Sequence, residues 1–90
     1  MEINYKVPGG KLLRISTTIK NDIIESITLY GDFFLHPEEA VVDIEKVLLN
    51  KKIDDIANTL EVLFKEKSIR AIGFSPRDVE DAIMQSIHIE

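Results

Sequence analysis

The sequence predicts an α+β fold, in which a small antiparallel three-stranded sheet is followed by three helices packed on one face of that sheet. Two periodicities support this prediction. Apolar and polar residues alternate through the first third of the chain, which is typical of strands with one buried face. In the rest, apolar residues recur at three- and four-residue spacing, which is typical of helices. Strands followed by segregated helices define the α+β class, and a chain of 90 residues is expected to form a single domain, residues 1–90.

The three predicted strands cover residues 3–7, 11–20 and 23–30. Pro8-Gly9-Gly10 breaks the chain after the first strand, and Lys20-Asn21-Asp22 supplies polar turn residues after the second. Short connections of this kind join antiparallel neighbours, so the strands are expected to form a meander. The residues expected on the buried face are Leu13, Ile15, Thr17 and Ile19 in the second strand, and Ile23, Ile27 and Leu29 in the third.

Three helices are predicted in the remainder. The first begins at Pro37, which fits a first helical position, and ends near Asn50, which tolerates the left-handed conformation found at helix ends. The second covers about residues 54–65, and the third begins with Ser75-Pro76-Arg77-Asp78, a capping serine followed three positions later by an acid. Their apolar stripes are Val41, Ile44, Val47 and Leu48; Ile56, Leu60, Leu63 and Phe64; and Val79, Ala82, Ile83 and Ile87. Between the last two helices, residues 69–74 are expected to be a short extended link.

The composition excludes several classes of protein. With 16 acidic and 11 basic residues, the net charge of −5 disfavours nucleic-acid binding, which needs a dense basic face. No apolar run approaches the ~20 residues of a membrane span, and no signal-peptide pattern opens the chain, so we expect no membrane partner and a cytoplasmic location. The absence of cysteine excludes disulfides, thiol chemistry and cysteine-based zinc sites.

Residues suited to catalysis or metal binding are sparse. His36 and His88 are far apart in the sequence and lack the helical spacing of a metal-binding pair. Asp54-Asp55 is better explained as two acids at the positive end of a helix dipole than as a cation site. We therefore expect no catalytic residue and no metal ligand on this chain.

Two short segments do not fit ordinary core or loop. In "PGGK", the amides of Gly9 and Gly10 together with Lys11 suggest an anion cradle, although Leu12 and a strand follow, which excludes a P-loop. Taken alone, a flexible turn with a solvated lysine explains "PGGK" equally well.

In "GDFF", Gly31 permits a tight turn at the end of the third strand. Phe33 and Phe34 must point to opposite sides of an extended backbone. One ring is therefore expected in the core, and the other is expected to be exposed, as aromatic residues at interfaces are.

The pairing of the predicted strands brings these two segments together. In a meander, the first turn and the end of the third strand lie at the same edge of the sheet. Asp32 could therefore pair with Lys11 or anchor the amides of the turn at Pro8-Gly9-Gly10, which we call the glycine turn. Either contact would fix the shape of this edge.

Four segments resemble a known family: "KVPGGKLLRI", "LYGDFFLHPEE", "DIEKVLLN" and "IGFSPRDVEDAI". They span the chain nearly from end to end. Together they resemble the accessory, or C-terminal, domain of lipoate–protein ligases, and most of all the split archaeal type, in which this domain is a separate small subunit. One departure is Asn50, where relatives often carry glycine.

The resemblance implies an accessory role with no catalytic residues on this chain. The large subunit of such a ligase binds lipoate and ATP with Mg, forms lipoyl-adenylate and transfers lipoyl to a lysine of a carrier domain. The small domain is needed chiefly for activation and binds no cofactor alone. The implied partners are the large subunit, in a heterodimer, and indirectly the lipoyl carrier domains of 2-oxoacid dehydrogenase or glycine cleavage proteins. The residues expected at the partner or active-site edge are Gly9, Gly10, Lys11, Gly31, Asp32, Phe33, Phe34 and His36.

Other interpretations stay open at the level of sequence. A lipoyl or biotinyl carrier domain presents its modified lysine at a hairpin tip, where Lys20 is expected here. Carriers are all-β, however, whereas the later part of this chain has helical periodicity. A small α+β module that only self-associates is the third option, and the acid that is activated could be lipoate, octanoate or biotin.

Overall fold

A three-stranded antiparallel meander forms the first layer of the molecule. The computed structural model describes residues 1–87, so His88 lies outside the described residues. The strands are β1 (Glu2–Lys6), β2 (Leu12–Lys20) and β3 (Ile23–Gly31), in the order β1-β2-β3. They agree with the predicted strands to within one residue at each end.

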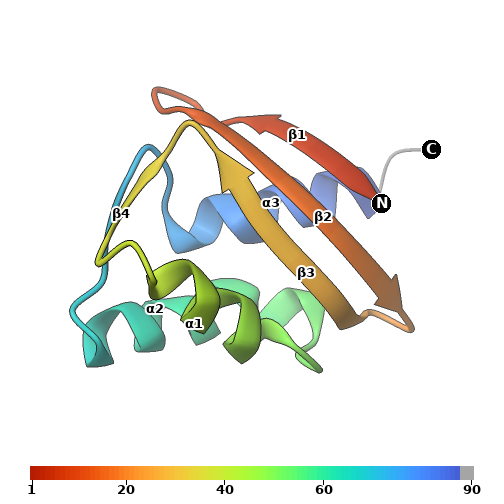
Figure 1. The fold of residues 1–90 in the computed structure, drawn as a ribbon. Coiled ribbons are helices and arrows are strands. Elements are labelled where there is room, and N and C mark those ends of the chain that lie inside the picture. Colours follow the sequence, from red (N-terminus) through yellow and green to blue (C-terminus); the bar gives the residue numbers. More distant parts are fainter. Residues whose placement is uncertain (88–90) are drawn as a thin grey trace.

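Three helices lie on one face of this meander, as Figure 1 shows. They are α1 (Ala40–Leu48), α2 (Ile56–Glu66), which follows a 3-10 turn η1 (Ile53–Asp55), and α3 (Pro76–Ile87). The α1 helix packs against β3, and α3 packs against both α2 and β1. The predicted α+β class is confirmed.

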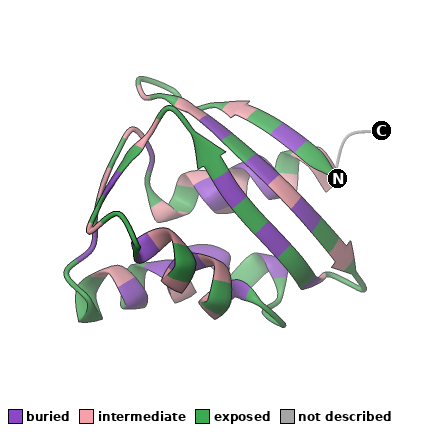
Figure 2. Cartoon of the chain, viewed as in Figure 1, coloured by how far each residue is buried: buried purple, intermediate pink, exposed green. Residues whose placement is uncertain are grey.

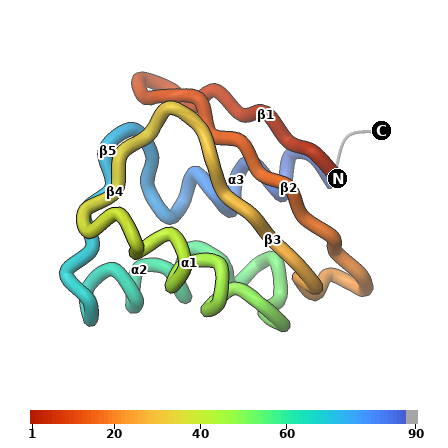
Figure 3. Tube along the Cα trace, in the orientation of Figure 1, coloured from red at the N-terminus to blue at the C-terminus, as the bar shows by residue number. Residues whose placement is uncertain are grey.

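A second sheet has only two short strands. β4 (Phe34–His36) pairs antiparallel with β5 (Arg70–Ile72), and Figure 3 shows them running side by side at one margin of the molecule. The segment expected to be an extended link is therefore a paired strand. Its partner lies more than thirty positions earlier in the sequence.

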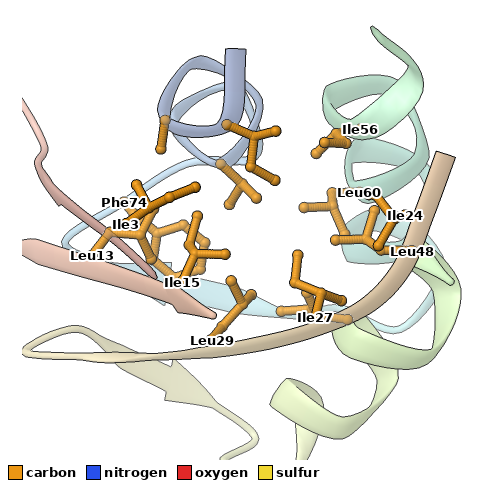
Figure 4. Close-up of a cluster of buried hydrophobic side chains, with 14 of the residues drawn as sticks. Ile3, Leu13, Ile15, Ile24, Ile27, Leu29, Leu48, Ile56, Leu60 and Phe74 are labelled. Atoms are coloured by element: carbon orange, nitrogen blue, oxygen red, sulfur yellow. The ribbon is translucent and has the colours of Figure 1, made fainter. Parts of the chain in front are cut away.

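One hydrophobic core lies between the meander and the helices. Figure 4 shows side chains from both layers converging, and Figure 2 shows buried positions alternating along the strands. Thr17 is a buried polar residue of this face, and its hydroxyl donates to the Ser26 carbonyl oxygen at 2.7 Å. The fully buried side chains with no exposed surface include Leu13, Ile15, Ile24, Ile44, Leu48, Ile56, Leu60 and Ile83.

At the start of β3, the residue that faces the core is not the one expected. Ile24 is buried with 0% exposure, whereas Ile23, expected inside, is half-buried. The register between β2 and β3 shifts after Thr18, which pairs with Ser26, because the next pair is Ile19 with Ile24. Such a bulge inserts a residue and changes which side chains face inward.

The first helix begins later than expected. α1 starts at Ala40 and not at Pro37, because His36 is still paired in β4 and the chain must turn before it can coil. Residues 37–39 make that turn, in which the Ala40 N–H donates to the Pro37 carbonyl oxygen at 3.0 Å. After the helix, Asn50 has the expected left-handed backbone, with φ of 67°.

The third helix begins as predicted. The Asp78 carboxylate accepts hydrogen bonds from the Ser75 N–H at 2.7 Å and from the Ser75 hydroxyl at 2.9 Å. The Asp78 N–H in turn donates to the Ser75 carbonyl oxygen at 3.0 Å, so these two residues together fix the entry of the chain into α3. Within residues 1–87, no helix is long and apolar enough to cross a membrane.

Candidate functional site

Three chain segments meet at one edge of the molecule, and we call this region the glycine edge: residues 8–11, 31–33 and 73–74. The Asp32 N–H donates to the Leu12 carbonyl oxygen at 3.1 Å, which joins the end of β3 to the start of β2. The Lys11 N–H donates to the Gly73 carbonyl oxygen at 3.0 Å, which joins the first turn to the end of β5. The expected meeting of the first turn with Gly31 and Asp32 is confirmed, and Gly73 is an addition that sequence reasoning missed.

Close approach of backbones explains the glycines at this edge. A Cβ atom at Gly31, where φ is +143°, would overlap with the Leu12 carbonyl oxygen. A Cβ at Gly10 would lie 2.5 Å from the Gly73 carbonyl oxygen, closer than side chains tolerate. The glycine edge is therefore a tightly packed junction of three backbones.

The glycine turn does not offer the row of free amides that was expected. The Gly10 N–H donates to the Val7 carbonyl oxygen at 2.9 Å, and the Lys11 N–H is engaged by Gly73. The Lys6 ammonium group donates to the carbonyl oxygens of Val7, at 3.5 Å, and of Gly10. The turn is therefore largely closed on itself. Of the two glycine amides that "PGGK" suggested for an anion cradle, that of Gly10 is already engaged, so the suggestion is wrong for this amide.

The suggested pair between Lys11 and Asp32 is also absent. Among residues 1–87, the side-chain ion pair that forms is Arg77 with Glu80. The stem of Lys11 instead lies along Gly73, because a Cβ built there would be 2.7 Å from the Lys11 Cγ. Lys11 is exposed, so its ammonium group extends from a rigid base into solvent.

Phe33 and Phe34 face opposite ways, as expected. Phe33 is half-buried against the core, and its ring makes an edge-to-face contact with Phe74, with centroids 4.8 Å apart and an interplanar angle of 66°. Phe34 is 67% exposed. Edge-to-face geometry is a favoured arrangement of aromatic rings, so Phe33 secures β4 to the chain that follows β5.

His36 and Phe34 line a shallow hollow over the two short strands. The hollow has a volume of about 620 Å³ and is lined by residues 34–36 and 70–72. His36 therefore lies on the β4–β5 ribbon and not in the glycine edge. Ile72 and Arg70 share this hollow and were not expected from the sequence, since a three-residue strand is too short to show a period.

The outer face of the meander carries a polar contact of its own. The Tyr30 hydroxyl donates to the Glu2 carboxylate at 2.9 Å. Hydrogen bonding from Ser16, and next from Tyr30, lowers the pKa of Glu2, and the same bond to Glu2 raises the pKa of Tyr30. Both side chains are exposed, so this pair is a surface feature and not a buried reactive one.

Two other kinds of site, a metal centre and a carrier lysine, can be compared with the structure. Within residues 1–87, no three histidine, aspartate or glutamate side chains lie together as metal ligands. Lys20 ends β2 beside a hairpin turn, as a carrier lysine would, but it belongs to an α+β domain and carriers are all-β. The described chain therefore offers two surface features. The first is the glycine edge, from which the Lys11 ammonium group projects, and the second is the two-stranded β4–β5 ribbon beside it, on which Phe34 is exposed.

The chain belongs to the family described as the bacterial lipoate protein ligase C-terminus, because the family model matches residues 2–83. The resemblance noted in the sequence is thus confirmed.

Particular relatives narrow the similarity to the split type. The chain is 28% identical over 80 residues to "Lipoate-protein ligase A subunit 2" of Thermoplasma acidophilum, which covers 89% of this chain and 83% of that protein. It also shares its fold with a solved chain from an archaeal lipoylation system of Thermoplasma acidophilum, which comprises a bi-partite lipoate protein ligase and its E2 lipoyl domain. The TM-score is 0.77 at 22% identity, over 100% of this chain and 96% of that chain.

Proposed function

We propose that this chain is the accessory subunit of a two-component lipoate–protein ligase. In this role it is needed, with a large catalytic subunit, for ATP-dependent activation of lipoate to lipoyl-adenylate before transfer to a carrier-domain lysine. The observation that carries this proposal is the match to a family of ligase C-termini over residues 2–83, together with similarity to a relative that is itself a ligase subunit.

The physical basis of this role is closure of the small chain over the adenylation site of the large subunit. A second body that closes over an adenylation site excludes water and orders the loops around the nucleotide. A domain with a rigid edge suits this task, because docking of the domain on the large subunit then fixes where the edge lies. ATP, Mg and lipoate would be held by the large subunit, and the complex would act in the cytoplasm on lipoyl carrier domains.

Within this proposal, the glycine edge faces the nucleotide. With two amides of the turn engaged, Lys11 is the group that can meet phosphate. Its backbone is held by hydrogen bonds with Val7 and Gly73, and the next residue, Leu12, accepts a hydrogen bond from the Asp32 N–H. A single ammonium group near a pyrophosphate stabilises the charge that develops there during activation.

The test is lipoate-dependent ATP–pyrophosphate exchange with three samples: the large subunit alone, this chain alone, and the reconstituted pair. We expect exchange with the pair and little with either component. Full exchange by the large subunit alone would remove the need for this chain, and exchange by this chain alone would show a catalytic site of its own. The same assay with octanoate and biotin identifies the acid.

A further inference from the structure

We propose, on the basis of the function proposed above, that the outer face of the β4–β5 ribbon is the surface through which this chain docks on its large subunit. We further propose that the partner presents an apolar pocket flanked by carboxylates. We call this surface the ribbon face and define it as Phe34, His36, Arg70 and Ile72.

The centre of the ribbon face is an exposed apolar pair. Phe34 is 67% exposed and Ile72 is 64% exposed, which makes them the two most exposed large apolar side chains among residues 1–87. They are direct cross-strand partners, so their side chains lie next to each other on one face. A single exposed apolar residue is ordinary, but two adjacent ones at this exposure form a patch that a partner can cover.

The flank of the ribbon face is positive. His36 pairs with Arg70 two positions along, so these side chains lie on the same face as Phe34 and Ile72. The described residues lining the hollow over this face carry no carboxylate, although the chain has a net charge of −5. Charge complementarity therefore calls for carboxylates on the surface opposite Arg70.

Charge also separates the ribbon face from neighbouring surfaces. Phe34 borders a second, smaller hollow of about 320 Å³ that contains Glu38, so the positive flank is confined to the ribbon. A third hollow contains the exposed Val42 and Leu49, but glutamates and a lysine are mixed there. The ribbon face is thus an apolar centre with a flank of one sign.

A second copy of this chain does not fit the ribbon face as well. In a two-fold dimer each patch meets itself. Arg70 would then meet a flank that carries another Arg70 and no acid to pair with it. A different subunit with an acidic flank supplies the carboxylate that a second copy lacks, and we therefore assign the ribbon face to the large subunit.

The ribbon face is rigidly connected to the glycine edge. The opposite side of the ribbon packs inward through Leu35, which is buried, and through Ala71. Gly73 directly follows β5, and its carbonyl oxygen accepts from the Lys11 N–H. Docking at the ribbon face would therefore fix where Lys11 lies, without contact between Lys11 and the docking pocket.

The experiment measures binding of the chain to the purified large subunit by isothermal titration calorimetry. We expect Phe34→Ala and Ile72→Ala each to raise Kd about tenfold or more, as buried apolar anchors do. Arg70→Glu should raise Kd further than Arg70→Gln, because it places like charges opposite one another. Val42→Ala and Val62→Ala, at exposed positions on α1 and α2, are the matched controls and should bind like the wild type. Thermal unfolding of each variant checks that the fold is retained.

The outcomes separate the two proposals. If the wild-type pair binds and activates lipoate while Phe34→Ala and Ile72→Ala bind normally, the docking surface is wrong and the proposed function stands. If the wild-type chain neither binds nor stimulates the large subunit, the proposed function fails, and the docking surface with it. Sedimentation of the chain alone is the third measurement. A dimer that Phe34→Ala dissociates would assign the ribbon face to a second copy and overturn this inference.

Discussion

Phe33 and Phe34 are consecutive residues with separate roles. The Phe33 ring packs on Phe74 and the core, whereas Phe34 projects from the ribbon. We expect Phe33→Ala to lower the free energy of unfolding by about 3 kcal/mol, the lower end of the range for aromatic truncation, because the ring is half-buried. Phe34→Ala should change it by less than about 0.5 kcal/mol.

Urea denaturation of both variants measures these two changes. Phe33→Leu is the matched control and should recover much of the loss, since it restores apolar volume without the ring. Equal large losses for both alanine variants would place Phe34 in the core and contradict this assignment.

Gly31 and Gly9 both have positive φ, but their surroundings differ. A Cβ at Gly31 would overlap with the Leu12 carbonyl oxygen, whereas nothing lies within 4 Å of a Cβ at Gly9. Gly9→Ala should therefore cost about 1 kcal/mol, from backbone conformation alone. Gly31→Ala should cost clearly more, because the β2–β3 pairing must also move apart. Comparing the denaturation midpoints of the two variants tests this, and equal costs would show that contact at Gly31 is unimportant.

Lys11 is the residue whose charge the proposed function uses. Its stem is held against Gly73 and its ammonium group is exposed, so Lys11→Ala should keep the fold and the complex. We expect this variant to slow formation of lipoyl-adenylate and to spare transfer from preformed lipoyl-adenylate to a carrier domain. The two half-reactions, measured separately on the reconstituted pair, decide the matter. If both half-reactions slow equally, or if neither slows, the glycine edge does not lie near the nucleotide.

At the scale of elements, carboxylates of one element satisfy the backbone of another. The Glu80 carboxylate on α3 accepts from the Ala57 N–H in the first turn of α2 at 2.9 Å. The Glu45 carboxylate on α1 accepts from the Leu29 N–H of β3 at 2.9 Å. These contacts leave fewer unsatisfied donors at a helix start and at a sheet edge, and they fix the helices relative to the sheet.

Glu80→Ala should therefore destabilise the domain by about 1–2 kcal/mol, the usual cost of losing a helix cap. Arg77 is the control, because it pairs with Glu80 at 3.4 Å but its side chain is 64% exposed. Arg77→Ala should cost less than about 0.5 kcal/mol, as exposed ion pairs do. A larger loss for Arg77→Ala than for Glu80→Ala in thermal unfolding would show that the ion pair, and not the cap, matters.

At the scale of the whole molecule, sheet and helices share one core. Side chains from the meander and from all three helices belong to a single buried cluster. We therefore expect one cooperative unfolding transition. The chain has no tryptophan and two tyrosines, Tyr5 in β1 and Tyr30 in β3, so tyrosine fluorescence reports on the sheet. Its midpoint in urea should coincide with that of far-UV circular dichroism, which is dominated by the helices. Separate midpoints would mean that the two layers unfold independently.

Local patterns in the sequence determined most of the elements. The alternation through residues 12–20, the stripe from Ile56 to Leu63, the left-handed Asn50 and the Ser75–Asp78 start all depend on residues a few positions apart. The same holds for the opposite directions of Phe33 and Phe34. Each of these features is fixed by the geometry of one strand or one helical turn, so it can be predicted without the rest of the chain.

Contacts between distant segments were decided by the tertiary structure. β4 and β5 are three residues each, too short for a period, and each becomes a strand because the other is brought beside it by the packing of α1 and α2. The bulge that buries Ile24, the bond from Lys11 to Gly73, and the pairing of Phe34 with Ile72 arise in the same way. Such contacts depend on the energy of the whole assembled core and not on any local preference. The sequence therefore indicated an exposed aromatic and a glycine turn, and only folding placed Ile72 and Arg70 beside the first and Gly73 beside the second.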